Sequence, residues 1–258
     1  MTGGAVLITG AGRGLGAALA LSVAAKGHPV IGLGRDAQAL ETLAHAVNAT
    51  TGGSFTSVVG DVRDQAVLTA AVDRAEGLPG GLYGVIANAG IAGPTGPMHE
   101  LSDEDWNETI DVNLTAVFRL CREAIPPLLA HGRGRIILIG SVTGKRPLSG
   151  RAPYAASKLG IVGLARTLAL EVGRRGITVN VVSPWLVGGA RLDDVIHQQA
   201  AFGGRSEEEV RRELVAGTAI GRTVSDDDVA STIEFLLDAR SGSLTGQDFN
   251  VAAGAVMY

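Results

Sequence analysis

The stretch AVLITGAGRGLG, residues 5–16, joins an apolar run to a glycine-rich turn and then to a segment of helical period. The run Ala5–Thr9 is continuously apolar, as expected for a strand that helices cover on both faces. Glycine allows a tight turn and lets the backbone approach a pyrophosphate, which then lies at the N-terminus of the following helix. The order predicts a strand, a phosphate-binding turn and a helix, although a bare strand-to-helix turn would also use glycine.

Runs of the same kind recur along the chain and alternate with amphipathic segments. The further strand-like runs are Pro29–Leu33, Phe55–Val59, Leu82–Ala87, Arg135–Ile139, Ile177–Val182 and Gln247–Val251. The helical segments between them include Leu15–Lys26, Ala37–Ala49, Ala66–Glu76 and Tyr154–Arg175. This alternation predicts an α/β fold with a doubly wound, Rossmann-type sheet of about seven parallel strands and right-handed crossovers. No Pro/Ser-rich linker interrupts it, so we expect residues 1–258 to form one domain.

Composition narrows the class of protein. Of the 258 residues, 46% are hydrophobic and 19% are charged, which suits one sizeable core and excludes a disordered chain. The net charge of −4 gives no basic surface for nucleic acid or for an anionic membrane. No signal-peptide pattern is visible, and no apolar run approaches the ~20 residues of a membrane span. Cys121 is the one cysteine, so it cannot form an internal disulfide, and we expect a soluble cytoplasmic protein.

The segment 188–223 departs from the alternation, because it has helical patches but no strand-like run. It follows the sixth strand, and α/β sheets bind ligands beyond the carboxyl ends of their strands. The position predicts a substrate lid, with a plain surface excursion as the alternative. The patch Leu192–Ala200 has an apolar face without an obvious partner, formed by Leu192, Val195 and Ile196.

The end of the second strand bears on the choice of cofactor. Strands that bind NAD normally end in Asp or Glu, which accepts hydrogen bonds from the adenosine ribose. Gly34 stands there in this chain, and Arg35 follows it. A guanidinium suits a phosphate, so Arg35, with Arg13, favours the 2′-phosphate of NADP. Alternatively, Arg35 is a solvated loop residue and Asp36 either caps the next helix or, with a slide in register, binds the ribose of NAD.

A second cluster combines a hydroxyl, a phenol and an amine. Tyr154 and Lys158 are one helical turn apart, so both project from one face of a helix. Tyrosine titrates near ~10, and a fixed ammonium favours the phenolate and brings the pKa closer to neutrality. Ser141 follows the strand Arg135–Ile139, where it could bind a substrate oxygen. Each residue alone has an ordinary structural explanation, and a lone Tyr-x-x-x-Lys pair is common by chance.

Taken together, these stretches resemble the short-chain dehydrogenase/reductase family, and the resemblance covers essentially the full chain. Thr9–Gly16 resembles that family's cofactor motif, Asp61-Val62 its adenine-contacting pair, and Asn88-Ala89-Gly90 the Asn-Ala-Gly motif beside the cofactor. Arg35 falls where members that use NADP often carry a basic residue. The resemblance implies cofactor contacts from Gly10, Arg13, Gly14, Leu15, Gly16, Arg35, Asp61, Val62, Asn88, Ala89, Gly90, Tyr154, Lys158, Pro184 and Val187.

The resemblance also implies the catalytic roles. Ser141, Tyr154 and Lys158 match the catalytic serine, tyrosine and lysine in order and spacing. Asn113 falls on the asparagine that holds a proton-relay water in the family. From the residues alone, Asn113 would be a polar residue tolerated inside a helix, a poor place for asparagine. No metal ion is expected.

Two departures from the family pattern affect the nicotinamide side. The family usually has Pro-Gly after strand six and then a threonine near the carboxamide. Here Trp185 replaces the glycine after Pro184, and Gly189 falls near the threonine position. Backbone groups of Val187 could still hold the carboxamide. The Trp185 side chain either lines the substrate pocket or is buried in the hydrophobic core.

The sequence thus predicts an NAD(P)-dependent oxidoreductase that moves a hydride between the nicotinamide and a ketone or secondary alcohol, most simply an NADPH-dependent ketoreductase. An NAD-dependent polyol or sugar-alcohol dehydrogenase would use the same site in reverse. A non-catalytic dinucleotide-binding protein is a remote alternative, since both Tyr154 and Lys158 are present. The resemblance implies a homo-oligomer, a tetramer or dimer, with a small carbonyl or alcohol substrate that the residues do not identify.

Overall fold

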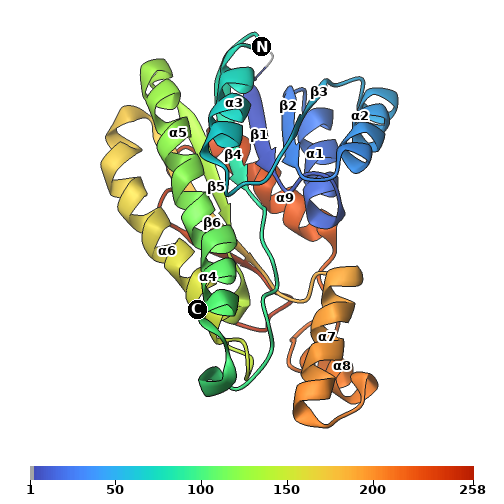
Figure 1. Ribbon diagram of the computed structural model, residues 1–258. Coiled ribbons are helices and arrows are strands. Elements are labelled where there is room, and N and C mark those ends of the chain that lie inside the picture. Colours follow the sequence, from blue (N-terminus) through green and yellow to red (C-terminus); the bar gives the residue numbers. More distant parts are fainter. Residues whose placement is uncertain (1–2) are drawn as a thin grey trace.

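The computed structural model describes residues 3–258, which form one parallel sheet between two layers of helices (Figure 1). The strand order is β3-β2-β1-β4-β5-β6-β7, and every neighbouring pair is parallel. The strands are β1 (Ala5–Thr9), β2 (Val30–Gly34), β3 (Phe55–Val59), β4 (Leu82–Ala87), β5 (Gly134–Ile139), β6 (Ile177–Pro184) and β7 (Asp248–Val251). The predicted doubly wound α/β fold is confirmed, and the order reverses between β1 and β4, where such sheets bind ligands.

Nine α-helices occur in the described residues. They are α1 (Gly14–Ala25), α2 (Ala37–Thr51), α3 (Gln65–Glu76), α4 (Asp103–Ile110), α5 (Ala116–His131), α6 (Ala152–Val172), α7 (Ala190–Gly203), α8 (Glu207–Ala216) and α9 (Asp226–Leu237). A π-helical stretch, Asp111–Thr115, joins α4 to α5. No helix among residues 3–258 is both long and apolar enough to cross a bilayer.

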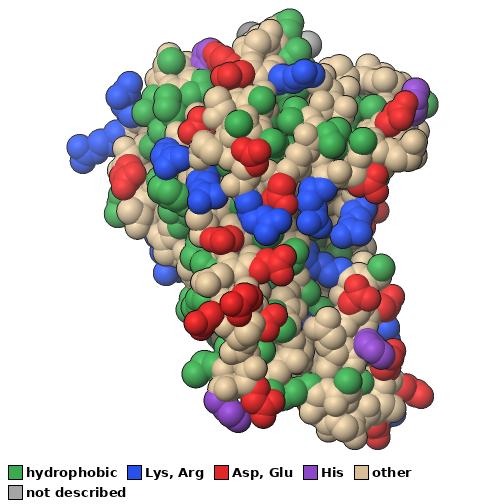
Figure 2. All heavy atoms as spheres, viewed as in Figure 1, with side chains coloured by type: hydrophobic (Ala, Val, Ile, Leu, Met, Phe, Trp, Pro, Cys, Tyr) green, Lys and Arg blue, Asp and Glu red, His purple; other side chains and the backbone are tan. Residues whose placement is uncertain are grey.

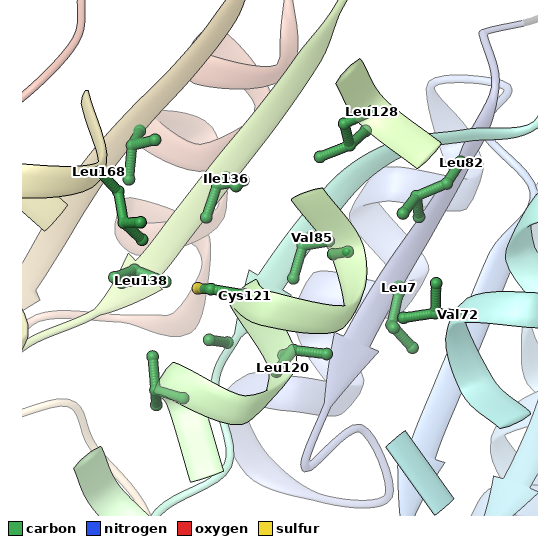
Figure 3. Close-up of a cluster of buried hydrophobic side chains, with 14 of the residues drawn as sticks. Leu7, Val72, Leu82, Val85, Leu120, Cys121, Leu128, Ile136, Leu138 and Leu168 are labelled. Carbon is green, nitrogen blue, oxygen red and sulfur yellow. The ribbon is translucent and has the colours of Figure 1, made fainter. Parts of the chain in front are cut away.

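Each face of the sheet has its own apolar core. On one face, α3, α5 and α6 pack on the strands, and Leu7, Val85, Leu120 and Leu138 meet there with the buried thiol of Cys121 (Figure 3). On the other face, the core is built from α1, α2 and α9. Full burial of one such aliphatic side chain contributes about 1.5–3 kcal/mol. Because both faces are covered, the central strands β1, β4, β5 and β6 are buried along their whole length, whereas the edge strands β3 and β7 are only partly buried.

A third apolar cluster holds α7 and α8, which project from the end of the sheet at the lower right of Figure 1. Leu192 and Ile196 are buried there against Trp185 and Val210. The expectation that the apolar face of this patch lacks a partner is therefore wrong. The physical reason is Trp185, whose ring supplies the apolar surface that a glycine could not.

Candidate active site

The glycine turn after β1 needs glycine at two positions. Gly10 has a φ of 67°, and a Cβ built there would lie 2.9 Å from the Ala89 Cα. A Cβ at Gly16 would lie only 2.0 Å from the Gly10 carbonyl oxygen. Arg13 is the N-cap residue of α1 and makes no side-chain capping bond, so the first N–H groups of the helix stay available. The residues therefore fit a dinucleotide, whose pyrophosphate would accept from these groups.

Asn88 fixes this turn against β4. Its side-chain amide donates to the carbonyl oxygens of Thr9 (3.0 Å) and Gly10 (3.2 Å). In return, the backbone N–H groups of Asn88 and Ala89 donate to the Thr9 hydroxyl at 3.1 and 3.0 Å. The structure thus brings the Asn-Ala-Gly segment and the glycine turn together, as a shared cofactor site requires.

The adenosine end of the predicted site is basic. Arg13 and Arg35 are both exposed there. Asp36 is occupied as the N-cap of α2, because its carboxylate accepts from the Ala39 N–H at 3.0 Å. Of the explanations weighed for Asp36, the structure shows capping.

Asp61 lies after β3 and is engaged by a residue that the sequence analysis did not name. Arg63 donates to its carboxylate at 2.8 and 3.0 Å. This hydrogen bond is the main reason that the pKa of Asp61 lies below its ordinary value, although burial raises it and the charge of Arg35 lowers it further. Val62 is partly buried against the core beside it. On the face in Figure 2, basic side chains form a band across the middle.

The three predicted catalytic residues come from two elements at the carboxyl edge of the sheet. Ser141 follows β5 and accepts from the Thr143 N–H at 3.1 Å, and its hydroxyl lies close enough to the Tyr154 phenol to lower the pKa of that phenol. Lys158 follows Tyr154 by one turn of α6, and its Nζ lies 5.8 Å from the tyrosine ring centroid. The ammonium is buried and donates to the Ile139 carbonyl oxygen at 2.7 Å.

The electrostatics of this cluster favour the phenolate. Burial raises the pKa of the Tyr154 phenol, but the charges of Arg191, Lys158 and Arg151 and the hydrogen bond from Ser141 outweigh it, so the pKa lies below its ordinary value. Burial lowers the pKa of Lys158 to about 8, against the opposing effect of the Tyr154 charge. Both groups therefore titrate closer to neutrality, which suits general acid–base chemistry.

Asn113 is fully buried in the π-helical stretch and is held by three hydrogen bonds. Its side chain donates to the Ile91 carbonyl oxygen (3.0 Å) and to Ser157 Oγ (3.2 Å), and accepts from the Ile91 N–H (2.8 Å). A Cβ at Gly90 would lie 2.9 Å from Asn113 Oδ1 and 3.7 Å from Lys158 Nζ. Gly90 therefore keeps open the space between Asn113 and Lys158, where a relay water would have to sit.

The chain after β6 supplies backbone groups on the nicotinamide side. β6 ends at Pro184, and Val187 pairs with Val224 in an isolated bridge. The two bonds of this bridge use the Gly188 N–H and the Leu186 carbonyl oxygen, so they leave the N–H and C=O of Val187 free for a ligand. Leu186 itself has a φ of 50°, a strained conformation of the kind that clusters at functional sites.

Trp185 is buried at 3% exposure in the cluster under α7, which favours the core interpretation. One side of its ring also borders a cavity of about 310 Å³, and the Arg146 guanidinium lies 5.7 Å from the ring centroid.

Two arginines beside Tyr154 were not identified from the sequence. Arg151 is 3% exposed, and its guanidinium lies 5.0 Å from the Tyr154 ring centroid. It donates to the Ala92 carbonyl oxygen at 2.9 Å and to the Thr95 hydroxyl at 3.3 Å. Arg191 begins α7. The i, i+3 spacing of Arg151 and Tyr154 was a detectable signal, whereas nothing in the sequence indicated that Arg191 lies near the phenol.

A glycine-lined helix N-terminus beside a buried phenol, with a serine and a lysine next to it, is the arrangement expected of a nicotinamide-dependent oxidoreductase. Residues 4–200 match the family model described as short chain dehydrogenase. The chain belongs to the short-chain dehydrogenase family and is an NAD(P)-dependent oxidoreductase acting on a carbonyl or CH–OH group.

Similar proteins extend this assignment over the whole chain. The granaticin polyketide synthase putative ketoacyl reductase 1 of Streptomyces violaceoruber is 37% identical over 98% of this chain and 93% of its own. A solved variant of actinorhodin polyketide ketoreductase with NADPH is 32% identical, with a TM-score of 0.93 over 99% of this chain and 98% of that one. NAD⁺-bound xylitol dehydrogenase is 26% identical, with a TM-score of 0.93 over 98% and 99%.

Proposed function

We propose that this protein is an NADPH-dependent ketoreductase that converts a ketone to a secondary alcohol. The observation that carries the proposal is the Tyr154 phenol, whose pKa is lowered and which lies beside Ser141 and Lys158. Relatives named as ketoacyl or polyketide ketoreductases support the reductive direction.

In this mechanism, bound NADPH supplies the hydride that reduces the carbonyl carbon. Ser141 donates a hydrogen bond to the carbonyl oxygen and holds it against Tyr154. Tyr154 donates its proton to that oxygen, so that the hydride and the proton together give the alcohol. Lys158 stabilises the resulting phenolate and holds the nicotinamide ribose, and Asn113 positions the water that returns a proton. These pre-placed donors stabilise the negative charge that develops on the substrate oxygen.

The preference for NADP over NAD rests on Arg35 and Arg13. Both side chains are exposed after the first two strands, and neither takes part in an ion pair among the described residues. Asp36, the competing ligand for an NAD ribose, is occupied in capping α2. An NAD-dependent polyol dehydrogenase is the second candidate, favoured by the similarity to NAD⁺-bound xylitol dehydrogenase.

Three further features belong to the proposal. Residues 188–223 act as the substrate lid, since α7 and α8 lie beyond the carboxyl edge of the sheet (Figure 1). The protein self-associates, because α5 and α6 expose Phe118 and Leu159. It works in the cytoplasm, where the thiol of Cys121 stays reduced.

A Tyr154→Phe variant tests the proposal, assayed over a panel of ketones with NADPH and NADH. Loss of the proton donor is expected to lower kcat by roughly 100- to 10,000-fold, whereas NADPH should still bind, because all the other expected cofactor contacts are kept. Tyr258→Phe is the matched control, since that tyrosine is 81% exposed. A Tyr154→Phe variant that keeps near-wild-type kcat would contradict the assignment.

A further inference from the structure

One face of α7 lies against the catalytic side of the molecule. Arg191, Gln198 and Phe202 share this face by their helical spacing. Gln198 accepts a hydrogen bond from the Thr95 hydroxyl at 2.9 Å. A Cβ at Gly150, next to Arg151, would lie 3.1 Å from the Phe202 ring. Two of the three residues thus contact the segments that surround Arg151, and Arg191 stands on the same face at the end nearer the sheet.

A neighbouring face of α7 keeps the helix in this orientation. Leu192 and Ile196 are buried against Trp185, and the Gln199 side chain donates to the Ser149 carbonyl oxygen at 3.0 Å. These contacts fix the rotation of α7 about its axis. Because that rotation is fixed, Arg191 is held on the side of Tyr154.

Tyr154 is consequently surrounded by positive charge. Arg151 and Lys158 are at most 4% exposed, and the charge of Arg191 also lowers the pKa of Tyr154. None of the ion pairs among residues 3–258 uses Arg151, Lys158 or Arg191. The buried Nε of Arg151 has no hydrogen-bond partner in the described part of the chain. Buried charges in proteins are normally paired, and among residues 3–258 no carboxylate pairs with these three cations, so the Tyr154 phenolate is the one negative charge that they share.

A role in stabilising the phenolate accounts for only part of this charge. Lys158 already provides an ammonium within 5.8 Å of the Tyr154 ring. Arg191 adds an exposed guanidinium from a different element, α7. A guanidinium of this kind binds carboxylates in a bidentate manner.

We propose that Arg191, with Arg151 behind it, binds a carboxylate of the substrate, so that the preferred ketone is an oxo acid with its carboxylate close to the reacting carbon. This inference rests on the proposed ketoreductase activity and names its substrate class. A neutral ester of the same ketone would lack the ionic contact and would be the poorer substrate.

The test compares acetoacetate with methyl acetoacetate in steady-state reduction by NADPH. Wild-type enzyme is expected to prefer the acid in kcat/KM by about tenfold or more, as for a charge-assisted pair. Arg191→Ala is expected to abolish most of that preference, and Arg191→Lys to keep part of it. Arg212→Ala removes the same charge from an exposed position of α8 and should leave the acid-to-ester ratio unchanged.

A binding measurement separates this inference from the proposed function. Calorimetry on the enzyme–NADPH complex measures the affinity for 3-hydroxybutyrate and for its methyl ester, two products that cannot react with the reduced cofactor. Tighter binding of the acid than of the ester in the wild type, with loss of that difference in Arg191→Ala, supports the inference whether or not either ketone is reduced. Failure to reduce either ketone would count against the reductase proposal alone.

Two results would overturn the inference while leaving a ketoreductase in place. The first is reduction of both ketones with no preference for the acid. The second is an Arg191→Ala variant in which activity on both substrates falls equally and the dissociation constant of NADPH rises, because Arg191 would then bind the cofactor.

Discussion

Replacing Arg35 with alanine should weaken the binding of NADPH while leaving the binding of NADH almost unchanged. The residue directly follows β2 and is exposed beside the glycine turn, and its charge reaches the carboxylate of Asp61. Arg63 is already bound to that carboxylate, whereas Arg35 is free to meet a 2′-phosphate. NADH has no such phosphate, so the substitution should affect NADPH almost exclusively.

The size of the effect follows from the exposure of Arg35. A charge-assisted hydrogen bond contributes roughly 1.5–3 kcal/mol when it is well shielded, and exposed ion pairs contribute roughly 0.2–1 kcal/mol. The phosphate would lie at the protein surface but carry up to two charges, so about 1–2 kcal/mol is a reasonable range. That range corresponds to a roughly five- to thirtyfold rise in KM for NADPH.

Steady-state kinetics with each cofactor at about 20 mM ionic strength measures the effect, and repetition at about 1 M salt should shrink it because the Debye length falls to about 3 Å. Arg74→Ala is the matched control, since Arg74 is equally exposed but lies in the last turn of α3, away from the strand ends. Equal losses for NADPH and NADH in Arg35→Ala would refute the reasoning, as would a wild-type preference for NADH.

Two other predictions depend on close packing. Gly16→Ala places a Cβ 2.0 Å from the Gly10 carbonyl oxygen, so it should weaken the binding of both cofactors at least about tenfold, as measured by fluorescence titration. Gly163→Ala is the control, because a Cβ at this position of α6 meets nothing within 4 Å, and this variant should bind both cofactors normally. Cys121 is 1% exposed, and burial raises its pKa to about 12. A thiol reagent at pH 8 should therefore detect no reactive thiol in the folded protein and one thiol per chain after unfolding in guanidinium. Rapid reaction of the native protein would contradict the buried placement of Cys121.

The central strands were predictable from the sequence because burial on both faces leaves nearly continuous apolar runs, and the partly buried edge strand β3 was predictable from its β-branched and aromatic residues. β1, β3 and β4 have the predicted bounds, and β6 extends beyond its apolar run to Pro184. The π-helical turn around Asn113 was not predicted. Its extra residue per turn depends on how α4 and α5 pack on α6, which no local pattern records.

The candidate site was predictable where its residues are neighbours in the chain. The glycine turn and the Tyr154–Lys158 pair are local patterns, so spacing alone places their members together. The contacts of Arg63 with Asp61 and of Arg151 with Tyr154 were not predicted, although each arginine lies within three residues of its partner. An arginine close to a site in sequence is usually a solvated side chain, so its position alone does not indicate a contact. Arg191 is far from Tyr154 in the sequence, because the rest of α6, β6 and the connection to α7 lie between them. No local pattern could therefore predict that the two residues are neighbours.

Trp185 connects the departure from the family pattern to the charge around Tyr154. A glycine at this position would leave Leu192 and Ile196 without the apolar ring on which they pack. The tryptophan therefore helps to fix the rotation of α7, and that rotation leaves Arg191 exposed but close enough for its charge to lower the pKa of the Tyr154 phenol. The glycine turn and the Asn88-Ala89-Gly90 segment resemble the family's cofactor motifs, whereas Trp185 packs against α7 from the end of β6 and Arg191 lies on α7 itself. Because the cofactor contacts are common to the family, the selectivity of this protein should reside in that helix and the residues that hold it.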